Sequence, residues 1–318
     1  MGDSKEELLK KILAYKKWRH RVKIADGIVT QGYNTIEDDW EFYGMPDNVV
    51  DKSILDIGAN DGYYSFEAEK RGAKSVTAID IYTGNGSTMV DGWSIDGISM
   101  LKEYLDSKVE IISKSVFDVK ELSKNWDLVF CSDVLSWLDN IQSAVLLISG
   151  VCNEKIVIRD TFLQDTSNVP KVEKRKHAKG YFNRMNLAFI KNELNMNGFK
   201  KIQVEPIYSF KHFEWQVNNF PAAFSHSEVG LYAYPEMEVP DSWITLNGDW
   251  VLSEYDGFVY IQAKGWVKKE DVQIQPRFKS NIATQSIKKW IPDAILNGYL
   301  SRNSIEKNTM EYCITATK

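Results

Sequence analysis

The stretch Ile54-Leu55-Asp56-Ile57-Gly58-Ala59-Asn60-Asp61-Gly62 decides how this 318-residue chain folds. It starts as the apolar run of a short buried strand, passes through a turn bracketed by Gly58 and Gly62, and leads into the helical pattern of Tyr63–Arg71. Glycine reaches backbone angles closed to other residues and lets the backbone come close to a ligand. A strand, a glycine turn and a helix in this order predict the first unit of a Rossmann-like sheet.

Short apolar runs continue to alternate with helical patterns up to residue 206. The predicted strands are Ser53–Ile57, Ser75–Ile79, Val109–Ile112, Leu128–Cys131, Lys155–Ile158 and Phe199–Val204. The predicted helices are Tyr63–Arg71, Ser94–Leu105, Ile141–Gly150 and Met185–Met196. Strands that alternate with helices build a parallel sheet with helices on both faces, so we expect an α/β core.

The segments outside this core have other patterns. Residues 4–23 have apolar positions near helical spacing with lysines between them, and predict one amphipathic helix. Residues 208–285 are rich in aromatics and turn signals, and their Asn247-Gly248 and Asp256-Gly257 pairs predict two hairpins. A helix over 286–300 and a strand over Tyr312–Ala316 are expected at the end.

These patterns predict four parts of the chain. They are an N-terminal helix and cap (1–50), the Rossmann-like core (51–206), a β-rich insertion related to the acceptor (207–285) and a return to the core with its last strand (286–318).

Acidic residues stand at the ends of the predicted strands, on the edge where such sheets bind ligands. Asp56 can bind the amino group of a methionine-derived ligand, and Asp80 can accept both ribose hydroxyls. Phe117-Asp118 follows the third strand and can pack on adenine and accept from its amino group. A NAD-dependent dehydrogenase would require glycine where Asp56 stands. The pattern therefore predicts S-adenosyl-L-methionine as the cofactor and S-adenosyl-L-homocysteine as its product.

Further stretches resemble one branch of the class I S-adenosylmethionine-dependent methyltransferases, which includes the bacterial enzyme that carboxymethylates a hydroxylated wobble uridine of tRNA. Beside the glycine turn, the resemblance rests on Trp18-Arg19-His20, Asp26–Gly32, Phe130–Leu135, Tyr181–Phe199 and Trp290–Lys318. It implies a Rossmann-like, mostly parallel sheet of seven strands with Tyr312–Ala316 as its antiparallel last strand. The expected cofactor contacts are Asp56, Gly58, Asn60, Gly62, Asp80, Ile81, Phe117, Asp118 and Ser132.

Three positions depart from that branch. Asp26 replaces the family's lysine before the glycine loop, His177 its tyrosine after the fifth strand, and Glu311 its arginine at the start of the last strand. In the family, these positions hold the extra carboxylate of a carboxylated cofactor. Two acids in place of two bases would repel that carboxylate by roughly a few kcal/mol, which favours the ordinary cofactor.

Methyl transfer to a hydroxyl requires a base, and three residues are candidate catalytic groups. His177 lies in the basic segment Lys171–Lys179, His20 lies in the family-like Trp18-Arg19-His20 element, and Asp160 follows the fifth strand. Either histidine can instead have a structural role, on a surface loop or at the end of the first helix. Asp133 and Asp160 are too few ligands for a magnesium ion, so no metal site is predicted.

The composition of the chain limits the class of acceptor that we expect. Hydrophobic residues make up 43% of the chain and charged residues 26%, and the net charge is −5, which lacks the basic footprint of most nucleic-acid enzymes. We expect O-methylation of a carbohydrate, nucleotide-linked sugar or other small intermediate, as in carbohydrate biosynthesis. The segment Lys171–Lys179 is either a solvated loop or a clamp for an anionic acceptor. A tRNA-modifying (carboxy)methyltransferase and a non-catalytic cofactor-binding module stay open as alternatives.

The cellular location that we expect rests on three features that the sequence lacks: paired cysteines, a membrane span and an apolar signal core. Its three cysteines, Cys131, Cys152 and Cys313, lie far apart and form no CxxC pair, so we expect neither a disulfide framework nor a zinc site. No apolar run reaches the roughly 18 residues of a membrane span, and the first residues lack an apolar signal core. We expect a cytoplasmic protein without a membrane segment.

Overall fold

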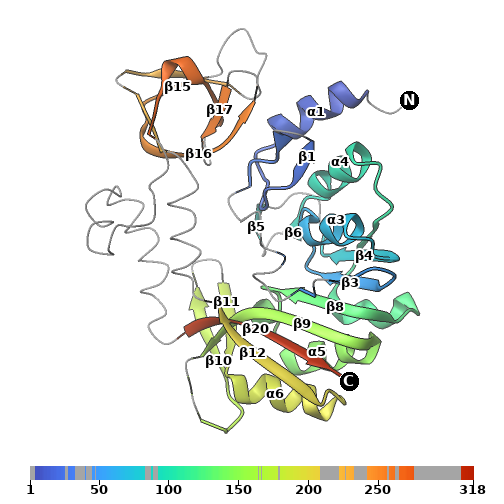
Figure 1. Cartoon of the computed structure of the whole chain (residues 1–318). Helices are drawn as coiled ribbons and strands as arrows, with labels where there is room; N and C mark the ends of the chain where they lie inside the picture. The colour runs from blue at the N-terminus through green and yellow to red at the C-terminus, as the bar shows by residue number, and fades with distance from the viewer. Residues whose placement is uncertain are drawn as a thin grey trace. The chain divides into compact units, whose positions relative to one another are not determined.

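The chain forms two compact units in a computed structural model (Figure 1). One unit combines residues 1–36 with 210–307, and the other combines 37–209 with 308–318. The described residues are 4–25, 28–32, 40, 45–46, 48–82, 87–88, 92–163, 165, 167–177, 180–207, 222–225, 227–232, 242–255, 258–261, 265–275 and 309–318. The four-part division expected from the sequence stays a prediction.

A seven-stranded sheet forms the centre of the larger unit, in the order β12-β20-β9-β8-β3-β4-β7. Its strands are β3 (Ser53–Ile57), β4 (Ser75–Asp80), β7 (Glu110–Ser113), β8 (Trp126–Ser132), β9 (Cys152–Leu163), β12 (Lys201–Ile207) and β20 (Thr309–Thr317). β20 is antiparallel to both neighbours, whereas the other adjacent strands run parallel. The predicted Rossmann-like sheet with an antiparallel last strand is confirmed.

The helices of this unit cover the sheet and bury its apolar runs. They are α3 (Tyr63–Lys70), α4 (Asp96–Tyr104), α5 (Ile141–Val151) and α6 (Leu187–Met196), with the short 3-10 helices η1 (Val116–Leu122) and η2 (Leu135–Trp137). Figure 1 shows α5 and α6 together on one side, away from α3 and α4. Central strand residues such as Leu55, Val129 and Ile156 are fully buried against this layer, which explains their continuous apolar runs.

A hairpin of β10 (Val172–His177) and β11 (Gly180–Met185) occupies the basic segment that the sequence suggested as a loop. Phe182 and Met185 are buried, and the side-chain amide of Asn183 donates to the carbonyl of Leu138 at 2.6 Å. Adjacent residues of a strand point to opposite faces, so these contacts hold both faces of β11, and the loop interpretation was wrong. A further short pair joins β5 (Ser87–Thr88) and β6 (Gly92–Trp93).

The smaller unit holds helix α1 (Lys5–Ala14) and a set of antiparallel strands. The strands are β1 (Lys23–Ala25), β2 (Ile28–Val29), β13 (Ala222–Phe224), β14 (Val229–Leu231), β15 (Ser242–Ile244), β16 (Asn247–Tyr255), β17 (Phe258–Ile261), β18 (Gly265–Lys268) and β19 (Gln273–Gln275), with the 3-10 helix η3 (Lys269–Asp271). Five of them form a sheet in the order β18-β17-β16-β13-β19. A core that includes Val259, Ile261 and Val267 closes it.

The first predicted helix is shorter than expected. Ser4 caps α1 through a capping box with Glu7, and the helix ends at Ala14 rather than at residue 23. The indole N–H of Trp18 donates to the carbonyl of Ile12 at 3.0 Å, so this side chain folds back over the last turn instead of continuing the helix.

The two hairpin signals have different outcomes. Tyr255 lies opposite Phe258 in the β16–β17 pair, so the hairpin expected at Asp256-Gly257 is confirmed. Asn247-Gly248 instead opens β16, because Asn247 pairs with Phe224 of β13 while β15 pairs with β14. The helix expected over 286–300 lies outside the described residues. Within the described part of the chain, no helix is long and apolar enough to span a membrane.

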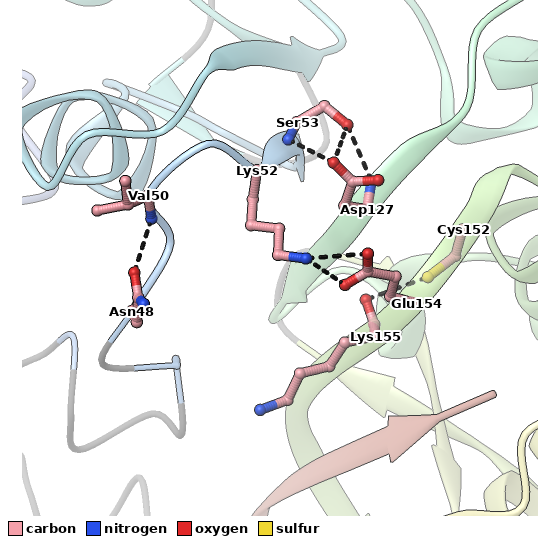
Figure 2. Close-up of polar contacts among 8 residues, drawn as sticks. All are labelled: Asn48, Val50, Lys52, Ser53, Asp127, Cys152, Glu154 and Lys155. Carbon is pink, nitrogen blue, oxygen red and sulfur yellow. Dashed lines mark hydrogen bonds and ion pairs between the residues drawn. The ribbon is translucent and has the colours of Figure 1, made fainter.

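Polar contacts close the amino-terminal edge of the large sheet (Figure 2). The Asp127 carboxylate accepts the backbone N–H and the hydroxyl of Ser53, both at 2.8 Å, which joins β8 to β3. Lys52 reaches Glu154 of β9 at 2.6 Å. The hydrogen bonds from Ser53, first the backbone and then the hydroxyl, lower the pKa of Asp127 below its usual range.

The substitution Asp127→Asn should reduce the acid sensitivity of the fold. A carboxylate with a lowered pKa stabilises the folded state above the ordinary carboxyl pKa, and this contribution is lost as pH falls through the folded value. We expect a loss of about 1 kcal/mol of unfolding free energy near neutral pH that shrinks toward about pH 3. Thermal unfolding across this range measures it.

Glu154→Gln is the matched control at the same edge, because its ion pair with Lys52 is exposed to solvent and should contribute little to stability. An unchanged pH dependence in Asp127→Asn would contradict the assigned role of this carboxylate.

Candidate functional site

The loop between β3 and α3 has an unusual backbone. Gly58, Asn60 and Gly62 have φ angles of 75°, 52° and 84°, in the left-handed region that glycine and asparagine tolerate best. The N–H groups of Gly58 and Ala59 both donate to the carbonyl of Ile79, at 2.9 and 3.1 Å. The predicted glycine turn is therefore folded against the end of β4.

The two glycines also allow close packing. A Cβ on Gly58 would lie 2.3 Å from a methyl group of Val134, in the turn after β8, and one on Gly62 would lie 2.7 Å from Phe66. These distances are too short for real contacts, so a side chain at either position would force a neighbouring side chain to move. The close packing of Val134 on Gly58 thus brings the turn after β8 against the loop after β3.

Replacing Gly58 by alanine should destabilise the chain more than the same change at Gly198. Gly198 has a φ of 90°, and a Cβ at that position would have nothing within 4 Å, so Gly198→Ala adds backbone strain alone. We expect a cost of about 1 kcal/mol there, and about 1 to 3 kcal/mol more for Gly58→Ala because of the clash with Val134. Denaturant unfolding of both variants measures the difference. Equal costs would contradict the tight packing at Gly58.

Asp80 ties this loop to the end of β4. Its carboxylate accepts the backbone N–H of Asn60 at 2.9 Å and that of Ile81 at 2.7 Å. The hydroxyl of Tyr82 donates to the carbonyl of Asn60 at 2.9 Å. Asp80 therefore lies at the carboxyl edge of the sheet and holds the loop backbone, a contact that the sequence did not predict, while its contact with ribose hydroxyls stays a prediction.

Three carboxylates give this edge a negative charge. Asp56 is buried and accepts the hydroxyl of Ser65 at 2.6 Å, which anchors the first turn of α3. Burial, followed by the charges of Asp80, Asp56 and Asp61, raises the pKa of the Tyr82 hydroxyl well above its usual range. The Tyr82 hydroxyl therefore lies in a region of negative charge, where a cationic ligand would be favoured.

Two apolar side chains are exposed beside the same edge. Ile81, directly after β4, is 48% exposed, and Phe117, after β7, is 39% exposed. Ser115 caps the short helix η1 by accepting the N–H of Phe117, which fixes the backbone from which Phe117 and Asp118 project. Large apolar side chains at neighbouring strand ends can cover a flat ring such as adenine.

A second polar cluster lies at the ends of β8 and β9. The guanidinium of Arg159 contacts the Asp133 carboxylate at 2.6 Å and the Ser132 hydroxyl at 3.2 Å. Asp133 has a φ of 54° and its N–H donates to the carbonyl of Arg159. Ser132, an expected cofactor contact, thus also supports this ion pair.

Asp160, a predicted catalytic residue, is fully enclosed in the same cluster. Its carboxylate accepts the backbone N–H groups of Ser136 at 3.0 Å and Thr161 at 2.8 Å. Burial and the charge of Asp133 raise the pKa of Asp160 to about 6, against the opposing charge of Arg184. A carboxylate this buried acts on its neighbours and does not itself reach solvent.

Asp160→Asn should change how stability depends on pH. A carboxyl group with a raised pKa binds a proton at a higher pH in the folded state than in the unfolded state. Its contribution to the free energy of unfolding therefore falls as pH rises from about 4 to about 6. The asparagine variant should lose this decline between pH values of about 4 and 7, whatever its absolute stability. Melting temperatures over that range test it, and a decline as steep as in the parent chain would contradict the raised pKa.

The two histidine candidates stay predictions. The side chain of His177 lies outside the described residues, as do those of Asp26 and Glu311. His20 is buried in the smaller unit, where its carbonyl accepts the hydroxyl of Thr30 at 2.7 Å. Within that unit, Gly32 packs directly on the His20 backbone.

The sequence reasoning missed Tyr82, Arg159 and Arg184. Tyr82 follows Asp80 by two residues, so its place at the strand end was a usable signal. Arg159 stands within a strand and Arg184 within the unexpected hairpin, stacked over the ring of Phe182 at 4.0 Å. Neither position can be identified without the register of the sheet.

Some known proteins resemble this chain over part of its sequence or in its fold. No family model matches the chain. The curated tRNA U34 carboxymethyltransferase of Helicobacter acinonychis (strain Sheeba) is 27% identical over 135 residues, which cover 42% of this chain and 48% of the relative. The chain thus spans about half the length of the curated relative that it matches.

Solved structures resemble the chain at the level of its fold. Phosphoethanolamine N-methyltransferase 2 of Haemonchus contortus in complex with S-adenosyl-L-methionine is 14% identical, with a TM-score of 0.49 over 100% of this chain and 60% of that one. The N-terminal domain of EvdMO1, in the presence of SAH and D-fucose, is 16% identical, with a TM-score of 0.47 over 64% of this chain and 90% of that one. The chain has the Rossmann-like fold of the class I S-adenosylmethionine-dependent methyltransferases and resembles the tRNA U34 carboxymethyltransferase branch in sequence.

Proposed function

We propose that this chain is an S-adenosylmethionine-dependent methyltransferase whose cofactor binds at the carboxyl ends of β3, β4 and β7. The observation that carries the proposal is the left-handed glycine loop, which Asp80 holds at the end of β4, together with the buried carboxylates of Asp56 and Asp61 on either side of Gly58 in the chain. S-adenosylmethionine carries positive charge on its sulfonium and amino groups, which these carboxylates would attract. The bound cofactor would supply an electrophilic methyl group.

The same charges argue against a dinucleotide. The pyrophosphate of NAD binds where backbone N–H groups and a helix N-terminus face the ligand without nearby carboxylates. Here the N–H groups of Gly58 and Ala59 are bonded to Ile79, and Asp56 is buried at the first turn of α3. Negative charge at this place would repel a pyrophosphate.

Each residue of the edge has a proposed contact. Asp56 and the loop through Gly58, Asn60 and Gly62 would face the methionine end, and Asp80 would accept the ribose hydroxyls. Ile81 and Phe117 would cover adenine, with Asp118 accepting from its amino group and Ser132 closing the side toward β8. For the base, His177 and His20 stay candidates, whereas the enclosed Asp160 would act through the residues around it.

For the acceptor, we propose a hydroxyl of a carbohydrate or another small intermediate. The basic hairpin supports this choice, because three of its cations have carboxylate partners. Lys171 and Arg175 contact Glu173 at 2.6 and 3.0 Å, and Lys174 contacts Asp139 at 3.3 Å. Paired cations bind a phosphate backbone less strongly than unpaired ones.

The alternative acceptor is a tRNA wobble uridine, which the 27% identity to the curated relative favours. We further propose a cytoplasmic location, since Cys131, Cys152 and Cys313 are all buried free thiols, as a reducing compartment allows.

Calorimetric titration with S-adenosylmethionine tests the cofactor site. Asp80→Ala should weaken binding by roughly tenfold to a hundredfold, because it removes charge-assisted hydrogen bonds to the ribose. Asp127→Asn is the matched control, since Asp127 lies in the same sheet at the opposite edge and should leave the affinity unchanged.

Two results would count against the proposal. Equal affinity in Asp80→Ala and the parent chain would mean that the site is wrong. Tight cofactor binding with no transfer to any sugar, small metabolite or tRNA would favour the non-catalytic binding module instead.

A further inference from the structure

We infer that Asp133 is the residue that binds and deprotonates the acceptor, that Arg159 positions it, and that the acceptor is an uncharged compound with free hydroxyl groups. This inference rests on the proposed function, because it requires a methyl donor at the adjacent edge. It assigns the polar cluster at the ends of β8 and β9 to the acceptor.

Asp133 lies next to the proposed cofactor loop. The Cβ position of Gly58 is 2.3 Å from Val134 and 3.9 Å from the carbonyl oxygen of Ser132, the two residues that flank Asp133. The Asp133 side chain is 21% exposed, unlike the enclosed Asp160. Asp133 is therefore a carboxylate of this cluster that reaches the surface beside the loop.

The backbone at Asp133 is unfavourable for a residue with a side chain. Its φ of 54° lies in the left-handed region, at the point where β8 ends. Such conformations are strained for most residues with a side chain and are concentrated at functional sites. The turn directs a carboxylate toward Arg159 at a place where glycine would be easier to accommodate.

Arg159 holds this carboxylate in one orientation. Only 9% of its side chain is exposed, and its guanidinium bridges Asp133 and the Ser132 hydroxyl. A carboxylate offers about four lone-pair sites, so the contact with Arg159 does not exhaust its capacity to accept a hydrogen bond. An acceptor hydroxyl can therefore donate to Asp133 while Arg159 fixes the orientation of the carboxylate.

The charges of the cluster select the class of acceptor. Asp133 and Asp160 balance Arg159 and Arg184, and Asp56 adds a further negative charge nearby. Burial, followed by the carboxylates of Asp160, Asp56 and Asp133, raises the pKa of the Cys131 thiol, which lies among them. A phosphate group would meet no excess positive charge in this cluster, whereas a neutral hydroxyl would find a carboxylate acceptor.

In the proposed methyl transfer, each bond that forms is matched by a bond that breaks. The acceptor hydroxyl gives its proton to the Asp133 carboxylate as its oxygen forms a bond to the methyl carbon. The bond between that carbon and sulfur breaks, and its electron pair stays on sulfur, which leaves a neutral thioether. No metal ion or further reactant is required.

The test measures S-adenosylhomocysteine formation with uncharged methyl glycosides and polyols, their phosphate esters, and bulk tRNA. We expect turnover with uncharged compounds. Asp133→Asn, which tolerates the left-handed backbone and can still accept from Arg159, should lower kcat by about 100-fold or more and keep the cofactor dissociation constant within about twofold.

Two variants of Arg159 distinguish a role in positioning Asp133 from a purely structural role. Arg159→Lys should recover part of the kcat lost in Arg159→Gln, and Arg159→Gln should shift the pH dependence of kcat, which a purely structural role would leave in place. Asp139→Asn is the matched control, because Asp139 is 94% exposed in the segment that follows β8. This variant should have the same kcat as the parent chain.

Three results would overturn the inference while cofactor binding remains intact. They are turnover only with phosphate esters or tRNA, turnover with none of the uncharged compounds, and an Asp133→Asn variant as active as Asp139→Asn. Failure to bind S-adenosylmethionine at all would instead contradict the proposed function.

Discussion

The carboxylate of Asp80 accepts the backbone N–H groups of Asn60 and Ile81, and the rest of the site is arranged around this contact. It holds the loop after β3 against the end of β4, where Gly58 also bonds to Ile79. The loop can lie there only because its backbone turns left-handed at Gly58, Asn60 and Gly62. One side chain thus fixes the shape of the proposed cofactor site and contributes to its charge.

The two edges of the sheet use the same residue types for different purposes. At the amino-terminal edge, Asp127 bonds to Ser53 and stabilises the register of two strands. At the carboxyl-terminal edge, carboxylates are buried or crowded together, and Asp160 has a raised pKa that costs stability at neutral pH. Groups retained at such a cost are concentrated where proteins bind or react, which is why we place cofactor and acceptor at this edge.

The sheet and the cofactor loop could be predicted from the sequence, whereas the acceptor side could not. Apolar runs and the glycine turn are local signals, and they identified β3 and its neighbours within a few residues. The sequence did not predict the hairpin of β10 and β11, because charged residues interrupt the apolar pattern to which the buried Phe182 and Met185 would contribute. The pair of Asp133 and Arg159 depends on strand register and on a left-handed turn at an aspartate, neither of which a sequence pattern displays.

A crystal structure of the chain with S-adenosylhomocysteine would show whether the cofactor binds at the carboxyl edge of the sheet. We expect ribose hydroxyls within hydrogen-bond distance of the Asp80 carboxylate, adenine against Ile81 and Phe117, and the sulfur atom directed toward Asp133. A ligand bound elsewhere on the chain, or an empty carboxyl edge in crystals grown at saturating ligand, would contradict this expectation.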